Sequence, residues 1–265
     1  MDAFFGYAVI SLMGVCLGMI GAGGSILALP VLVYLFRVEP TLATTYTSIL
    51  VGLTAAVGAL RDPTAKSINV YAVLFFGLPC IVGACLARVC LITIIPDVLV
   101  AAQMFTITRD SFVMLIFSIT MISSGLSMLL RRHQQSVQRT GYRWLVPVGF
   151  GVGLITGIVG AGGGFLILPS LVILAGLEIR SAVGTSLTII AMKSAVSFVG
   201  DLSAGLQINF QLIASLMAVA IPSVLIGRWL NSHVQASELK TGFAIVVSTV
   251  GIAIGIHNLS TVFGT

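Results

Sequence analysis

The chain has 265 residues, of which 58% are hydrophobic and only 8% are charged, and its mean hydropathy is +1.14. About a quarter of the residues of a soluble domain are charged, so this composition excludes a water-soluble globular protein and favours an integral membrane protein. The net charge of +5 comes from basic residues in a few loops, without the clustered basic patch that a nucleic-acid partner would need.

Five apolar segments are predicted in each half of the chain. Those of the first half cover residues 3–20, 25–36, 43–60, 70–95 and 110–130. Those of the second half cover residues 144–159, 164–177, 182–199, 208–230 and 240–258. We therefore expect an all-α polytopic protein with about eight to ten membrane segments. Its parts are a first membrane repeat (1–130), a basic cytoplasmic linker (131–143) and a second membrane repeat (144–265).

The two halves share one sequence motif. Residues 18–39 read GMIGAGGSILALPVLVYLFRVE and residues 157–178 read GIVGAGGGFLILPSLVILAGLE, with 12 identities in 22 positions at a constant offset of 139. The shared Gly, Pro and Glu positions argue against a chance match of apolar sequence. One single-residue gap then aligns Thr47-Ser48 with Thr185-Ser186. These matches predict an internal duplication.

The second and seventh segments are short, and each follows a glycine-rich break. Their 12 to 14 residues make a helix about 20 Å long, whereas the hydrocarbon core of a bilayer is about 30 Å thick. Short, glycine-interrupted segments at matching places in two halves are typical of a transporter's binding site. Either each break turns a hairpin that returns to the same face, which makes the halves inverted, or it interrupts one crossing, which makes them parallel.

The distribution of basic residues favours the hairpins, because cytoplasmic loops are enriched in Lys and Arg. In the hairpin topology nine basic residues lie on one side, namely Arg61, Lys66, Arg131, Arg132, Arg139, Arg143, Arg180, Arg228 and Lys240. Three lie on the other side, namely Arg37, Arg88 and Arg109. The parallel topology divides the same residues six against six. We therefore predict inverted-topology repeats, with the linker in the cytoplasm and both termini outside it.

A helix that begins at a break directs free N–H groups and the positive end of its dipole toward the break, which suits an anion. The residues predicted to bind substrate in this way are Gly21, Gly23, Gly24, Ser25, Gly160, Gly162, Gly163 and Gly164. The alternative role of these glycines is close helix packing, which we assign instead to the spaced glycines Gly14, Gly18, Gly149, Gly153, Gly157, Gly251 and Gly255.

Further candidate substrate contacts lie in the helices that follow. The hydroxyls of Thr47, Ser48, Thr185 and Ser186 either donate to an anion or bond back to their own helix. Lys193 is a cation deep in an apolar segment. Such charges face a cavity or a partner, so Lys193 either compensates the charge of the substrate or pairs with a carboxylate such as Asp201.

Other function classes lack their motifs. No nucleophile–base set, nucleotide motif or group of metal ligands is visible in the sequence, so we expect a protein that is not an enzyme and has neither a cofactor nor a metal site. Glu39 and Glu178 match between the halves and follow the short segments. They are expected to lie at the membrane surface in a structural role.

The paired G-x-G-G-[GS]-x-x-x-x-P elements, each followed by a helix with a Thr-Ser pair, resemble those of the sulfite exporter TauE/SafE family. The resemblance runs from about Gly14 to Gly255, and it carries the glycine motifs over as the substrate region. It implies a multi-pass transporter in the bacterial inner (cytoplasmic) membrane that moves small sulfur-containing anions such as sulfite, sulfoacetate or other organosulfonates. Two departures are Ser25 in place of Gly164, and Lys193 where an uncharged polar residue is expected.

From the family we expect export by alternating access. Import of thiosulfate or a related oxyanion and a passive anion channel are the alternatives. The predicted partners are the small anionic substrate and the lipid bilayer, with no nucleic acid, and a homo-oligomer is left open.

Overall fold

The computed structural model describes residues 2–20, 25–60, 68–93, 98–102, 105–130, 144–159, 164–203, 209–231 and 236–263. The elements of the first half are α1 (Asp2–Ile20), α2 (Ser25–Pro30), the π-helix η1 (Val31–Leu35), α3 (Pro40–Leu60), α4 (Val70–Ala72), the π-helix η3 (Val73–Gly77), α5 (Leu78–Thr93), β1 (Val98–Ala102), β2 (Phe105–Thr108) and α6 (Arg109–Leu130). Those of the second half are α7 (Leu145–Val159), α8 (Gly164–Ile173), α9 (Ile179–Ser203), α10 (Phe210–Asn231) and α11 (Ala236–Phe263).

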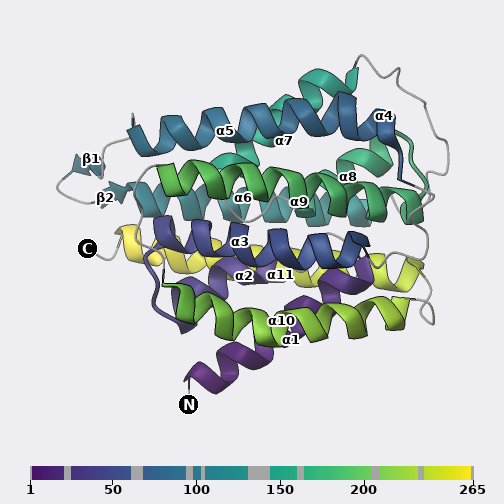
Figure 1. Ribbon diagram of the computed structural model, residues 1–265. Helices are drawn as coiled ribbons and strands as arrows, with labels where there is room; N and C mark the ends of the chain where they lie inside the picture. Colours follow the sequence, from purple (N-terminus) through teal and green to yellow (C-terminus); the bar gives the residue numbers. More distant parts are fainter. Residues whose placement is uncertain are drawn as a thin grey trace.

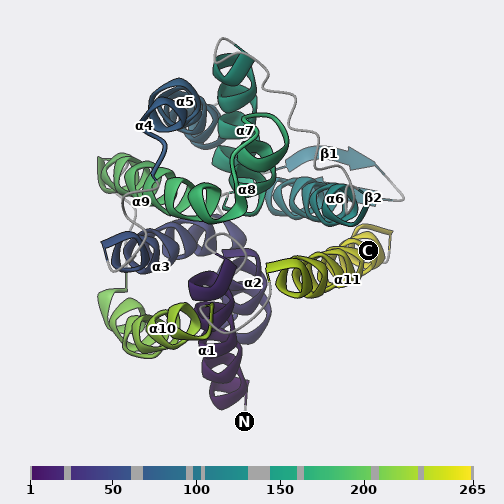
Figure 2. The same ribbon diagram turned by 90° about the vertical axis from the view of Figure 1, so that its right-hand side faces the viewer.

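The helices run in nearly the same direction and form one bundle with two lobes (Figure 1). Seen along the helix axes, α5, α6, α7, α8 and α9 make the upper lobe, and α1, α2, α3, α10 and α11 make the lower lobe (Figure 2). The most extensive helix contacts join α5 to α7, α1 to α10, α6 to α11 and α3 to α9. Each of these pairs takes one helix from each half of the sequence, so the two halves are interlocked.

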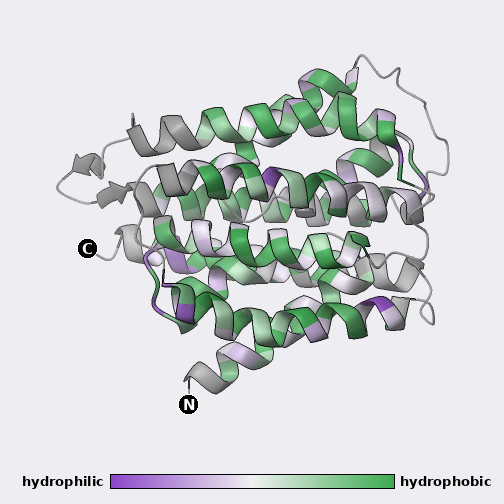
Figure 3. Cartoon of the chain, in the orientation of Figure 1, coloured by the Kyte–Doolittle hydropathy of each residue, from purple (hydrophilic) through white to green (hydrophobic). Residues whose placement is uncertain are grey.

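The bundle presents apolar residues on its outside. Hydrophobic colour covers most of the length of the helices, and hydrophilic colour gathers at the turns at their ends (Figure 3). Four helical stretches are long and apolar enough to cross a membrane: Leu42–Leu60, Val70–Ala87, Ser181–Gly200 and Phe210–Leu230. Shorter apolar stretches are Phe5–Met19, Ser111–Ser127, Leu145–Ile158 and Val247–Ser260. An apolar exterior of this kind is stable only in lipid, so the chain is a multi-pass membrane protein.

The turns after the two short helices repeat each other. The backbone N–H of Val38 donates to the carbonyl of Leu32 at 2.9 Å, and 139 residues later Leu177 donates to Leu171 at 3.2 Å. Both turns include a residue with positive φ, Arg37 at 53° and Gly176 at 63°. The matched turns show that the duplicated sequence folds into the same local structure twice.

Glu39 and Glu178 follow these turns and are exposed, and their place at the membrane surface stays a prediction. The carbonyl of each accepts a hydrogen bond of 2.8 Å from the N–H four residues later, at Ala43 and Ala182. The two residues therefore begin the long helices α3 and α9 at matching positions.

The spaced glycines let helices approach closely. A Cβ at Gly83 of α5 would collide with the Phe150 carbonyl of α7, and a Cβ at Gly227 of α10 would collide with the Val15 carbonyl of α1. A Cβ would also approach other atoms of the protein closer than 3.0 Å at the glycines predicted to serve packing, Gly14, Gly18, Gly149, Gly153, Gly157, Gly251 and Gly255. The packing role of these glycines is confirmed.

Two glycines of α7 allow a matched test of this packing. Gly153→Ala is expected to destabilise the protein by about 1–3 kcal/mol, because the new methyl group would overlap the Cys80 carbonyl. Gly151→Ala is expected to be neutral or to stabilise by up to about 1 kcal/mol, because nothing lies within 4 Å of its Cβ position and alanine favours helix. Thermal unfolding of both variants in detergent would check the difference, and equal melting temperatures would contradict it.

The all-α prediction was incomplete. Residues between the predicted segments 70–95 and 110–130 form an antiparallel pair of strands, in which Ala102 lies opposite Phe105 and Val98 lies opposite Thr108. Valine favours extended backbone, and the run VLVAA supplies it. The predicted linker 131–143 lies outside the described residues, so its cytoplasmic placement stays a prediction.

Candidate functional site

The buried polar residues of this apolar bundle concentrate on the central helix pair, α3 and α9. The two helices pack closely at Gly52 of α3, where a Cβ would collide with Ser194 of α9. Ten buried polar or charged residues lie on the pair: Thr44, Thr45, Thr47, Ser48, Thr54, Thr185, Ser186, Lys193, Ser194 and Ser197. Because buried polar groups are costly in a membrane protein, this pair is the strongest candidate for a substrate path.

The predicted glycine site is only partly within the described residues. Gly21, Gly23, Gly24, Gly160, Gly162 and Gly163 lie outside them, and so does the side chain of Ser25. The described chain places the end of α1 at Ile20 and the start of α2 at Ser25. In the second half α7 ends at Val159 and α8 begins at the buried Gly164. The element boundaries therefore coincide with the predicted breaks.

The two Thr-Ser pairs differ in their hydrogen bonds. The Thr185 hydroxyl donates to the Ser181 carbonyl at 2.7 Å, and the Ser186 hydroxyl donates to the Val183 carbonyl at 2.9 Å. Thr47 is fully buried, and its hydroxyl has no hydrogen-bond partner within the described part of the chain. The back-bonding alternative thus describes the second pair, and Thr47 does not follow it.

Two asparagines that the sequence analysis missed join the halves. The backbone N–H of Asn69, at the start of α4, donates to the Thr185 hydroxyl of α9 at 3.0 Å. The N–H of Asn209, at the start of α10, donates to the Tyr46 hydroxyl of α3 at 3.0 Å. Each asparagine side chain also accepts from the N–H three residues later, at 3.0 and 3.1 Å, and so caps its helix. The dipeptide Ile-Asn recurs in the sequence at 68–69 and 208–209. This repeat could have pointed to the two asparagines as equivalent residues of the halves.

Lys193 is 3% exposed on α9. It interacts electrostatically with the thiols of Cys80 and Cys85 in α5, and Cys80 shares a side-chain hydrogen bond with Thr156 of α7. Thr156 lies one turn before α7 ends at Val159. The positive charge of Lys193 therefore faces the α5 side of α9, and α5 packs against α7. The side chain of Asp201, the alternative partner of Lys193, lies outside the described residues.

The position in the first half that is equivalent to Lys193 holds a neutral residue. In the register that aligns Thr47 with Thr185, Lys193 corresponds to Ala55. The hydroxyl of the neighbouring Thr54 is buried and donates to the carbonyls of Leu50 and Val51 at 2.7 and 3.1 Å. The candidate site is thus asymmetric, with its cation on α9.

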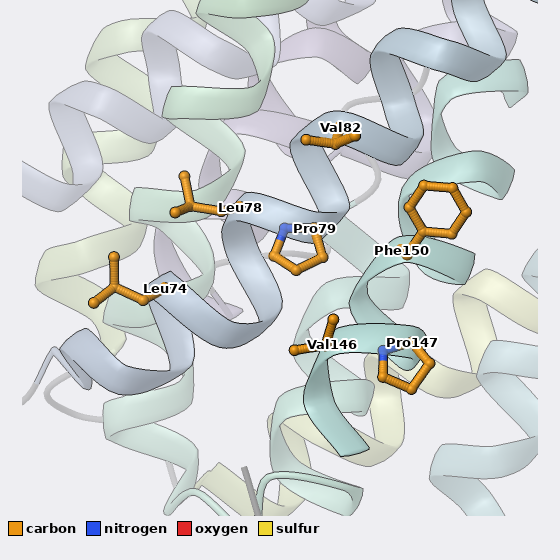
Figure 4. Close-up of a pocket in the computed structure, with 7 residues that line it drawn as sticks. All are labelled: Leu74, Leu78, Pro79, Val82, Val146, Pro147 and Phe150. Atoms are coloured by element: carbon orange, nitrogen blue, oxygen red, sulfur yellow. The ribbon is translucent and has the colours of Figure 1, made fainter. Parts of the chain in front are cut away.

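An apolar groove on the outside of the bundle is separate from this site. It has a volume of about 540 Å³ and lies between the α4–η3–α5 segment and α7. Figure 4 shows its lining residues, Leu74, Leu78, Pro79, Val82, Val146, Pro147 and Phe150. No predicted site residue lines it, and its apolar walls offer nothing to an anion. Across the described residues, no group of three or more His, Cys, Asp or Glu side chains could hold a metal ion.

Comparison with known proteins supports a transport role. The model of the family described as "Sulfite exporter TauE/SafE" matches residues 7–254. A Xylella fastidiosa (strain Temecula1) protein named "Probable membrane transporter protein" is 26% identical over 251 residues, which cover 91% of this chain and 90% of the relative. A protein of the same name from strain 9a5c is 28% identical over 184 residues, which cover 66% of this chain and 65% of that relative. No solved structure matches the chain. Since the family match spans nearly the whole sequence, the chain belongs to the sulfite exporter TauE/SafE family of membrane transporters.

Proposed function

We propose that this chain is a secondary transporter that exports small sulfur-containing anions, such as sulfite, sulfoacetate or other organosulfonates, across the cytoplasmic membrane. The observation that carries the proposal is the burial of Lys193 in the middle of an apolar membrane helix, on the side that faces α5. An ammonium group at that depth is costly unless an anion or another polar group faces it. A small anion bound between Lys193 and the N-terminus of α8 would be stabilised by the ammonium charge and by the positive end of the helix dipole.

The substrate site in this proposal lies between the two glycine-rich breaks and the central helices. The backbone N–H groups at Gly21, Gly23, Gly24, Ser25, Gly160, Gly162, Gly163 and Gly164 would bind the anion's oxygens. Lys193 would supply the compensating charge. Thr47 and Ser48 would donate their hydroxyls to the anion from α3. Thr185 and Ser186, whose hydroxyls donate to carbonyls of their own helix, would position the site from α9.

The proposal includes inverted halves, because two halves of opposite orientation allow a transporter to open its site to each side of the membrane in turn. Asn209, six residues after the end of α9, contacts Tyr46 near the start of α3. Asn69, nine residues after the end of α3, contacts Thr185 near the start of α9. Both contacts support an antiparallel arrangement of the equivalent helices α3 and α9, as inverted halves require. In Figure 1 both termini lie at the left-hand ends of the helices, together with the turn at 36–39, and the turn at 174–178 lies at the right-hand ends.

Uptake by purified protein in liposomes would test the proposed function. The panel is sulfite, sulfoacetate, thiosulfate, acetate and chloride, each with and without a pH gradient. We expect saturable flux of sulfite or sulfoacetate well above that of empty liposomes, and weaker flux of acetate and chloride. Saturation distinguishes a carrier from a channel, which would conduct many ions per opening. Flux of every sulfur-containing anion at the level of empty liposomes would contradict the proposal.

A further inference from the structure

Two buried hydroxyls on the central helix pair have no hydrogen-bond partner within the described part of the chain. Thr47 of α3 is 0% exposed and Ser194 of α9 is 2% exposed. Neither hydroxyl oxygen has a partner among the residues that the structure describes. Buried hydroxyls in folded proteins nearly always have a partner, and an exception requires an explanation such as a ligand or a bound water.

Other buried hydroxyls of the bundle have found partners. Thr54, on the same helix as Thr47, donates to the Leu50 carbonyl at 2.7 Å. Ser118 of α6 donates across the helix interface to the Gly251 carbonyl at 2.8 Å. Bonding back to a carbonyl of the preceding turn is open to any Ser or Thr in a helix. The lack of a partner at Thr47 and Ser194 is therefore a specific property of these two positions.

The duplication explains how Thr47 was left without a partner. The N–H of Asn69 in the first half donates to Thr185 of the second half, the residue that aligns with Thr47. The N–H of the matching Asn209 in the second half donates to the Tyr46 hydroxyl of the first half, and not to Thr47. Tyr46 thus performs the structural task that falls to Thr185 in the other half, and the hydroxyl of Thr47 is available for another role.

Ser194 has no hydroxyl counterpart in the first half. In the register that aligns Thr47 with Thr185 it corresponds to Ala56, and Ala55 precedes that residue. Alanine would suffice for packing at this crossing, because the Ser194 Cβ already meets Gly52. Ser194 also directly follows Lys193, the buried cation of α9. A polar atom retained here, next to a charge and without a packing need, points to a ligand.

We infer that Thr47 and Ser194 are substrate contacts, each donating its O–H to an oxygen of the transported anion. This inference rests on the proposed function and extends it to Ser194, with Tyr46 as the structural substitute for Thr47. The two residues lie at different depths, because five residues separate Thr47 from Gly52, which is about 7.5 Å along α3. The anion would meet Ser194 beside Lys193 and Thr47 nearer to the start of α3. Such donors suit an anion with several oxygen acceptors rather than a halide.

Isosteric variants separate this role from a structural one. Thr47→Val and Ser194→Ala are each expected to raise the half-saturating concentration for sulfite by about tenfold, the loss expected for one hydrogen bond to a charged group. Their melting temperatures are expected to stay equal or rise, because no hydrogen bond of the protein is lost. The matched controls are Thr120→Val and Ser118→Ala, both on α6, whose hydroxyls have partners. The controls are expected to change the half-saturating concentration less than twofold, and Ser118→Ala is expected to lower the melting temperature.

The same liposome assay keeps the two proposals apart. Sulfite flux by the wild type at the level of empty liposomes would contradict the proposed function, whatever the variants do. Normal wild-type flux with half-saturating concentrations within twofold of wild type in both Thr47→Val and Ser194→Ala would overturn the hydroxyl assignment alone. A drop in melting temperature in both variants, with affinity no weaker than in the controls, would overturn it as well and return both residues to a structural role.

Discussion

Replacing Lys193 with methionine is expected to raise the half-saturating concentration for sulfite by about 10- to 100-fold. A hydrogen bond that involves a charged group contributes about 1.5–3 kcal/mol, and each 1.4 kcal/mol is a factor of ten in affinity. Methionine keeps the length of the side chain and removes the charge, so the effect isolates electrostatics. Concentration-dependent uptake by purified protein in liposomes would measure it.

The stability of the same variant tells a substrate contact from a structural ion pair. Burying an ammonium group costs free energy that methionine does not incur, so Lys193→Met is expected to unfold at the same or a higher temperature than wild type. Lys193→Arg is the charge-retaining control and should lose less affinity than methionine. An unchanged half-saturating concentration together with a lower melting temperature would return Lys193 to a structural role.

Leucine at either glycine-rich break is expected to abolish transport. Gly24→Leu and Gly163→Leu should each reduce sulfite flux by at least about 100-fold, because a large side chain prevents the close approach of an anion to the backbone N–H groups. Both variants should still reach the membrane, which immunodetection in membrane fractions would establish. Gly151→Leu is the matched control, because nothing lies within 4 Å of a Cβ there, and it should transport normally.

This prediction addresses the part of the site that the sequence motifs define. Full sulfite flux by purified Gly24→Leu or Gly163→Leu would exclude the backbone N–H groups of that break from substrate binding. Loss of flux in Gly151→Leu as well would show that leucine in this region disrupts the protein generally, so this control separates a binding role from a general effect of leucine.

The order and approximate extent of the helices could be predicted from the sequence. Apolar runs bounded by glycine, proline or charge gave segments that agree with α1, α3, α6 and the other helices to within a few residues. The duplicated motif anticipated the matched turns at Arg37 and Gly176. Such features are local, and the residues that cause them are adjacent in the chain. The strands β1 and β2 were missed because a short valine-rich run between two long apolar segments resembles a loop.

Hydrogen bonds between helices that are distant in the sequence could not be predicted from the sequence. Thr47-Ser48 and Thr185-Ser186 look equivalent as dipeptides, yet their hydrogen bonds differ because Tyr46 precedes one pair and Gly184 precedes the other. The Tyr46 side chain reaches the Asn209 N–H, whereas Gly184 has no side chain that could do so. A pattern of residue types shows that a hydroxyl is present, and the three-dimensional packing decides whether it already has a partner.

Counterflow of labelled sulfite tests the central claim most directly. Liposomes that contain the purified protein are loaded with unlabelled sulfite and diluted into a trace of labelled sulfite. An anion carrier that alternates between two faces should accumulate label transiently above its external concentration, and Lys193→Met should accumulate much less. Label that only equilibrates, at the same rate with wild type and with empty liposomes, would contradict a sulfite-binding site between the two halves.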